Sequence, residues 1–77
     1  MTHELKIQKE YFSAVNEGKK RFEIRYDDRN YKVGDAIILN EIDNDNSFTG
    51  RNFFGIITYI TTYEQKKGYV VFSFDPL

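Results

Sequence analysis

Hydrophobic and polar positions alternate along much of this chain, and the pattern predicts several short strands and one helix. Residues 3–7 alternate with a period of two, which places Leu5 and Ile7 on one face of a first strand. Residues 8–17 instead repeat with the period of a helix, and Gly18 stands where a left-handed C-terminal cap is expected. The apolar side of this helix is formed by Tyr11, Phe12, Ala14 and Val15.

Four more strands are predicted after the helix, over residues 21–26, 36–42, 53–62 and 69–74. The first of these alternates strictly between apolar and charged side chains. One face carries Phe22, Ile24 and Tyr26, and the other carries Arg21, Glu23 and Arg25. We therefore expect the apolar face to pack on the core and the charged face to border solvent or a cleft.

Polar segments connect the predicted strands. Residues 27–35 read as a loop that ends in a Val-Gly-Asp turn, and residues 43–47 read as a hairpin tip that residues 49–50 complete. Residues 64–68 form a charged turn. Gly55 interrupts the long strand and marks a bulge or a tight bend.

The order of these elements predicts the fold class. A strand, a helix and four more strands indicate a mainly β (α+β) protein. A sheet this small with tight turns bends strongly, so we expect a partly open β-barrel of about five strands, with the helix after the first strand covering one end. Seven Phe and six Tyr supply the core, and 77 residues suit a single domain over residues 1–77.

Composition excludes several classes of protein. The chain has no cysteine, which rules out disulfides and thiolate metal sites, and its only histidine, His3, reads as a polar residue that borders a cleft with Lys6 at the start of the first strand. We therefore expect no metal and no cofactor. No secretory signal and no membrane-spanning run of about 20 apolar residues is visible, so a cytoplasmic location is the default expectation.

Charge is concentrated in one segment. The net charge is −1, but residues 19–32 hold six basic and three acidic residues, whereas the remainder holds five basic and nine acidic ones. A basic segment on a faintly acidic protein can attract an anion locally without general affinity for nucleic acid.

The central motif is Gly18-x-Lys20-x-x-Glu23-x-Arg25. It resembles the Gly-x-Lys-x-x-Glu signature of the ASCH domains, which belong to the PUA-like superfamily. The resemblance continues through Asp28-Arg29, Tyr31 and Val33-Gly34-Asp35, and it includes residues 3–6 and 68–71. In this extended form the chain is similar to a small bacterial and phage branch of that superfamily, which has no assigned function.

This resemblance implies a PUA-like barrel whose cleft binds RNA or a nucleotide-like ligand. The signature residues Lys20, Glu23 and Arg25 would face the cleft, with Arg29 and Lys6 at its rim. Lysine and arginine can contact phosphate, and a glutamate can accept a hydrogen bond from a base amino group. An exposed Tyr31 or Tyr26 can stack on an unpaired base. Asp28, Gly34 and Asp35 would hold the loop.

Three alternatives stay open at this level. The charged face can be an ion-pair ladder that only keeps the strand soluble. The chain can be a small amidohydrolase acting on acylated nucleosides, with Lys20 and Glu23 as catalytic candidates and Glu41 as the only other carboxylate near the cleft. However, some ASCH-like hydrolases carry a hydroxyl residue in place of Glu23 and a longer segment before the last strand, so recognition without chemistry is favoured. Finally, the strand from Phe53 to Tyr59 can mediate protein interaction or self-association.

Overall fold

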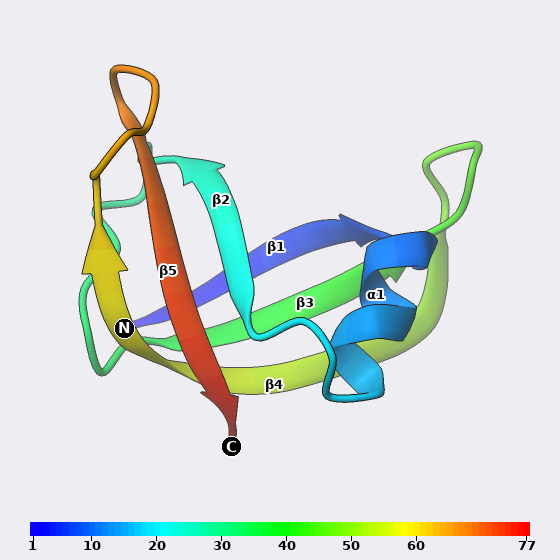
Figure 1. Ribbon diagram of the computed structural model, residues 1–77. Coiled ribbons are helices and arrows are strands. Elements are labelled where there is room, and N and C mark those ends of the chain that lie inside the picture. Colours follow the sequence, from blue (N-terminus) through cyan, green and yellow to red (C-terminus); the bar gives the residue numbers. More distant parts are fainter.

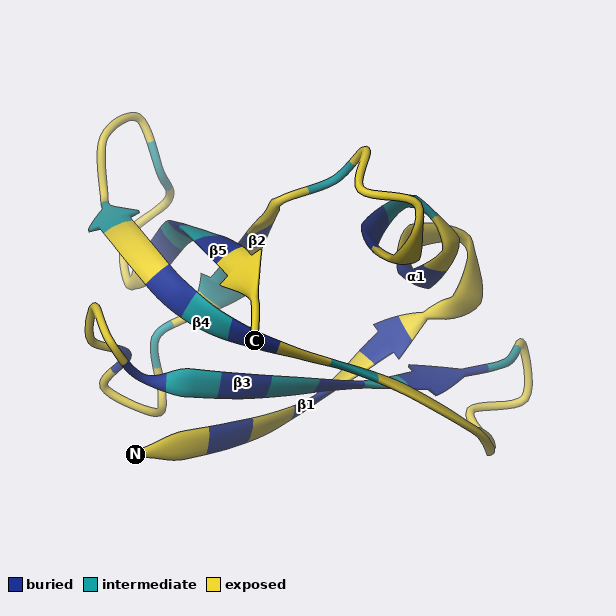
Figure 2. Ribbon diagram, turned by 90° about the horizontal axis from the view of Figure 1, so that it is seen from below, coloured by how far each residue is buried: buried dark blue, intermediate teal, exposed yellow.

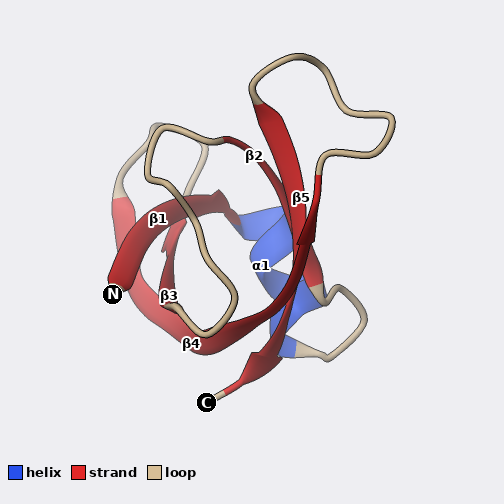
Figure 3. Cartoon of the chain, turned by 90° about the vertical axis from the view of Figure 1, so that its left-hand side faces the viewer, coloured by secondary structure: helices blue, strands red, loops and turns tan.

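A curled five-stranded sheet and one short helix make up the computed structural model, which describes residues 1–77 (Figure 1). The elements, in chain order, are β1 (Thr2–Gln8), α1 (Lys9–Asn16), β2 (Phe22–Tyr26), β3 (Ala36–Ile42), β4 (Phe48–Thr61) and β5 (Tyr69–Pro76). The sheet curves round into an open half-barrel (Figure 3). The predicted mainly β fold, with a partly open barrel and one helix after the first strand, is confirmed.

The order of strands across the sheet is β1-β3-β4-β5-β2. β1 is parallel to β3, and every other neighbouring pair is antiparallel. β1 and β2 are therefore the two edges of the sheet, although they are the first two strands of the chain. We call the open line between these two edges the seam. Strand edges carry main-chain groups that have no partner within the sheet.

The core lies inside the curve of the sheet and beneath the helix. Buried residues alternate with exposed ones along β1 and with half-buried ones in the middle of β5, as a period of two predicts (Figure 2). α1 contacts β1 and β3 and covers one end of the sheet, where Phe12 and Val15 are buried (Figure 1). The main core cluster is Leu5, Ile7, Phe12, Val15, Tyr31, Ile37, Leu39, Ile57, Val70, Phe72 and Phe74.

The end of α1 sets the start of the candidate site. Gly18 adopts a left-handed φ of +80°, which confirms the predicted cap. The main-chain N–H groups of Lys19 and Lys20 both donate to the oxygen of Ala14, at 2.9 and 3.1 Å. These bonds satisfy the end of the helix and fix the backbone of Lys20 just before β2 begins.

Two predictions about β4, its first residue and a bulge at Gly55, are wrong. The strand begins at Phe48, so residues 49–50 belong to the strand rather than to the hairpin tip. The register shifts lie between Asn40 and Ile42 and between Ile57 and Tyr59, not at Gly55. At Gly55 the backbone of β5 comes close instead, because an added Cβ would lie 3.0 Å from the main-chain oxygen of Asp75. α1 is the only helix, and it is neither long nor apolar enough to cross a membrane.

Candidate nucleic-acid interface

The faces of β2 are reversed relative to the sequence prediction. Glu23 is only 5% exposed, whereas Ile24 and Tyr26 are 53% and 57% exposed. The reason is the pairing of β2 with β5, which places Glu23 opposite Phe72, a residue with no exposed surface. Residues directly opposite on paired strands share a face, so Glu23 must point inward and the apolar side chains outward.

A carboxylate can occupy this inward position because two cations neutralise it. Lys20 Nζ lies 2.6 Å from Oε1 of Glu23, and Arg25 Nε lies 2.9 Å from Oε2. Each carboxylate oxygen therefore has its own charged donor. We call Lys20, Glu23 and Arg25 the triad, and its formal charge is one positive unit. Buried carboxylates need this kind of pairing, because an unpaired one carries a large desolvation cost.

Contacts on several sides hold Lys20 in place. Besides Glu23, its Nζ donates to the main-chain oxygen of Phe22 at 2.7 Å. The same atom lies 4.8 Å from the ring centroid of Phe22 and 5.8 Å from that of Tyr11, both within cation–π range. The ammonium is therefore positioned between a carboxylate and two aromatic rings.

Arg25 crosses the seam. Its Nη2 donates to the main-chain oxygen of Lys6 on β1 at 2.7 Å, while its Nε holds Glu23 on β2. A guanidinium has five N–H groups, so three stay available to a ligand. The side chain keeps 25% of its surface exposed.

Two hollows lie along the seam, on either side of Arg25. The first, of about 600 Å³, is lined by four exposed aromatic side chains, and we call it the aromatic hollow. Those side chains are Tyr11, Phe22, Tyr26 and Tyr69. The second, of about 450 Å³, is lined mainly by charged and polar side chains, and we call it the polar hollow. Its lining includes Glu4, Asp28, Arg29, Tyr31 and Asn40. Lys6, Arg25 and Tyr26 line both hollows.

Comparison with known proteins shows the family of this chain. The model of a family described as a domain of unknown function, DUF3850, matches residues 2–74. The chain belongs to the DUF3850 family. It is also similar to an "Uncharacterized 12.9 kDa protein in GpA 3'region" of Escherichia phage P2, with 49% identity over 59 residues. That match covers 77% of this chain and 53% of the relative, so it spans about half of the relative's length.

The DUF3850 domain places most of the candidate residues along the seam. The triad lines the aromatic hollow, and Arg25 also reaches the polar hollow. Lys6 lines both hollows, and Arg29 lines the polar one. Arg29 is loosely held, since its Nε lies 4.0 Å from a carboxylate oxygen of Asp28. These residues come together from β1, β2 and the loop after β2.

Tyr31 is not the exposed stacking residue that the sequence suggested. It is only 6% exposed, and its ring packs against Phe72 and His3 at centroid distances of 5.1 and 4.8 Å. Burial raises the pKa of its phenol, although Arg25 and Arg29 act in the opposite direction. Tyr31 therefore lines the polar hollow from within the core, and its faces are not free for a base.

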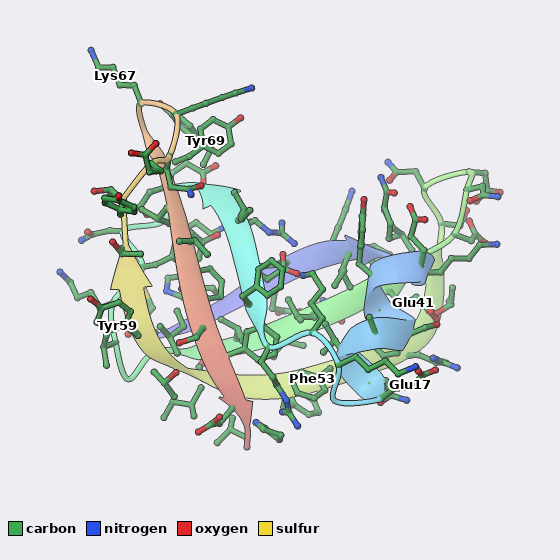
Figure 4. The ribbon with its side chains drawn as sticks, viewed as in Figure 1. Glu17, Glu41, Phe53, Tyr59, Lys67 and Tyr69 are labelled. Atoms are coloured by element: carbon green, nitrogen blue, oxygen red, sulfur yellow. The ribbon has the colours of Figure 1, made fainter.

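Two further expectations about side-chain position are wrong. Glu41 accepts a hydrogen bond from Oγ1 of Thr49 at 2.6 Å and pairs with Arg51 Nε at 3.3 Å, and it lines neither hollow. Figure 4 shows it beside α1, at the opposite end of the sheet from Tyr69. His3 is buried and bonded to Asp35 Oδ2 at 2.8 Å, so it does not border the seam.

The hydrogen bond from His3 also lowers the pKa of the Asp35 carboxyl below its ordinary value of 3.8. Asp35 further accepts from the main-chain N–H of Lys32 at 3.1 Å. His3, Asp35 and Lys32 thus fasten the loop after β2 to β1. This loop carries Arg29, so their contribution to the polar hollow is indirect.

Sequence reasoning missed several lining residues. Glu4 could have been found, because it lies two positions before Lys6 and so shares its face of β1. Asn40 and Tyr69 carried no such signal. They lie on β3 and β5, which are the neighbours of the two edge strands only because of the order of strands in the sheet. The structure shows no group of three or more His, Asp or Glu that could hold a metal ion. What the site offers is positive charge beside exposed aromatic rings.

Proposed function

We propose that this DUF3850 domain is an ASCH domain of the PUA-like superfamily that binds RNA or a nucleotide-like ligand along the seam. The observation that carries the proposal is the triad: two cations fixed on one buried carboxylate, directly beside exposed aromatic side chains. Single-stranded nucleic acids are recognised by this combination of positive charge for the backbone and aromatic faces for the bases.

Arg25 is the main phosphate contact in this proposal. Its guanidinium is held by Glu23 and by the main-chain oxygen of Lys6, so its orientation is fixed before a ligand arrives. Its three remaining N–H groups suit the planar, two-point recognition of phosphate that arginine provides. Lys6 and Arg29 add charge at the rim. Since the whole chain has a net charge of −1, binding should be weak, short-range and sensitive to salt.

Stacking is assigned to the outward face of β2 and its neighbours rather than to Tyr31. Tyr26 is 57% exposed, and its ring meets that of Tyr69 edge-on at a centroid distance of 5.5 Å. Tyr11 and Phe22 face the same hollow. Each stacked base contributes about 1–3 kcal/mol in single-strand binding. In this proposal, the exposed apolar side chains of β2 contact the ligand rather than the core.

Glu23 acts as a positioning residue rather than as a base-reading group. Both of its oxygens are engaged, one by Lys20 and one by Arg25. The same contacts weigh against the amidohydrolase alternative. The Lys20 ammonium donates to a carboxylate and to a carbonyl, and Glu23 has no oxygen free of a cation, so neither residue is arranged to attack or to move a proton.

The proposal is tested by titrating the isotope-labelled protein with single-stranded RNA octamers, followed by NMR at low and moderate salt. We expect shifts in Arg25, Tyr26 and Tyr69 that weaken as salt rises. Lys20→Ala should strongly reduce these shifts, because it removes one cation of the triad and leaves Arg25 as the only partner of Glu23, while the spectrum stays that of a folded protein. Lys67→Ala is the matched control, because Lys67 lies at the tip of the β4–β5 hairpin (Figure 4) and lines neither hollow.

Two results would contradict the proposal. One is the absence of RNA-induced shifts at low salt. The other is equal loss of binding in Lys20→Ala and Lys67→Ala, which would indicate a diffuse charge effect. Incubation with acylated cytidine in parallel should give no product.

A further inference from the structure

We infer that the ligand unit of the seam is a dinucleotide step, with one base in the aromatic hollow, the next base in the polar hollow, and the phosphate that joins them over Arg25 and Lys6. This inference rests on the proposed function. Its starting point is that the two hollows share a wall, formed by Lys6, Arg25 and Tyr26.

The shared wall carries two cationic side chains. Arg25 and Lys6 both belong to it, and the hydrogen bond from Arg25 to the main-chain oxygen of Lys6 ties the two residues together. In a single strand, a phosphate lies between two successive nucleosides. A cationic wall between two hollows therefore matches the charge order of one base, one phosphate and one base.

The volumes of the hollows fit this arrangement. At about 600 and 450 Å³, each falls within the range of small-ligand sites. A single nucleoside would occupy one hollow only and leave the other to water. A dinucleotide would use both hollows and the wall between them.

The two hollows differ in chemistry, so the two bases would be held in different ways. The aromatic hollow offers ring faces from Tyr26 and Tyr69, which stack on any base. In the polar hollow, Asn40 Nδ2 donates to Oε1 of Glu4 at 3.3 Å. This pair still has carboxylate and amide oxygens free to accept from an exocyclic amino group. The second base would therefore be read at its edge.

The test compares adenylyl-adenosine, adenosine monophosphate and adenosine, because adenine both stacks well and carries an amino group. Dissociation constants are measured by NMR titration at low salt. We expect the dinucleotide to bind at least about fivefold more tightly than the mononucleotide, since it adds one held base. The dinucleotide should shift both Tyr69 and Asn40, whereas the mononucleotide should shift residues of one hollow only.

Lys6→Ala isolates the shared wall. The Lys6 side chain is exposed, and its Nζ lies 5.6 Å from the ring centroid of Phe48. The substitution keeps the main-chain oxygen of residue 6, which Arg25 binds. We expect a loss on the order of fivefold in dinucleotide affinity and a clearly smaller loss in adenosine affinity, because adenosine has no phosphate for Lys6 to contact. Lys67→Ala should leave both affinities unchanged.

The outcomes separate the inference from the proposed function. If the dinucleotide binds no more tightly than the mononucleotide while a longer single strand still binds, the two-base inference is overturned and RNA binding stands. If Lys6→Ala weakens adenosine and the dinucleotide equally, the phosphate is not at the shared wall. If no single strand of any length binds, both proposals fail.

Discussion

Arg25 Nη2 donates to the main-chain oxygen of Lys6 at 2.7 Å, and this bond joins the two edge strands of the sheet. The same side chain pairs with Glu23 at 2.9 Å. One residue thus connects β1 to β2 and neutralises the carboxylate that β2 turns inward. The shape of the candidate site and the stability of the seam therefore depend on the same guanidinium.

Arg25→Ala should lower the free energy of unfolding by about 1–3 kcal/mol. The change removes the bond across the seam and leaves Glu23 with a single cationic partner, and a buried charge that loses a partner is costly. Urea denaturation measures the effect. Arg29→Ala is the control and should cost less than about 0.5 kcal/mol, because Arg29 is exposed and held only by a 4.0 Å contact. Equal stability of the two variants would contradict a bridging role for Arg25.

Acid should destabilise the protein through Asp35. The pKa of this carboxyl is lowered in the folded state by the hydrogen bond from His3, so below about 3.8 the unfolded chain binds more protons than the folded one. The stabilisation is therefore complete above the unfolded pKa and is lost as pH falls through the lower, folded pKa. Urea midpoints measured below about pH 5 should show this loss, and Asp35→Asn should remove it. A control variant, Glu10→Gln, changes an exposed carboxyl and should keep the slope of the wild type.

Gly68→Ala should displace the ring of Tyr26. Gly68 has a φ of +84°, and an added Cβ would lie 2.6 Å from Cε1 of Tyr26. Gly34 provides a matched control, since its φ is +94° and nothing lies within 4 Å of the added atom. Both variants should lose about 1–2 kcal/mol to the left-handed backbone, but only Gly68→Ala should shift the aromatic resonances of Tyr26 and Tyr69. Unchanged Tyr26 signals in Gly68→Ala would show that the ring does not lie against this turn.

Because the apolar face of β2 is exposed, this strand should tolerate polar substitutions on that face. Ile24→Thr should change the free energy of unfolding by less than about 0.5 kcal/mol, because the side chain is 53% exposed and threonine suits a strand. Val70→Thr, on the paired strand, should cost about 1–3 kcal/mol, because that side chain is only 5% exposed and the new hydroxyl would be buried. Thermal or urea unfolding of both variants tests the assignment. A large loss in Ile24→Thr would show that the apolar face of β2 is covered.

Local signals explain which parts of the fold the sequence predicted well. β3 occupies residues 36–42 as expected, because a run of β-branched residues is bounded by turn residues on both sides. α1 differs from its predicted span by one residue at each end, and the cap at Gly18 was visible in the sequence. The start of β4 was missed because Thr49 and Gly50 have the composition of a turn.

The direction of β2 could not be read from its alternation. A period of two shows which residues share a face, but it does not show which face meets the core. Here the choice depends on the pairing with β5, some 45 to 50 residues away along the chain, and on the two cations that neutralise Glu23. Tyr31 was misjudged for a similar reason, because it lies in a loop with no period and its burial comes from Phe72.

The residues of the candidate site likewise fall into those that local sequence could predict and those that it could not. Glu23 and Arg25 are two residues apart on one strand, so their common face follows from strand geometry alone. Glu4, Asn40 and Tyr69 lie on three other strands, and only the order of strands in the sheet brings them to the two hollows.

The order of strands also determines when the seam can first exist during synthesis on the ribosome. β2 is made early, but its hydrogen-bonded neighbour in the sheet is β5, at residues 69–76. A nascent chain that has not yet released β5 from the exit tunnel has β1, β3 and β4 available for pairing, yet no strand against which β2 can dock. The docking of β2, and with it the complete seam, therefore follows the release of β5, so a ligand that needs both hollows meets them only after β5 has left the exit tunnel.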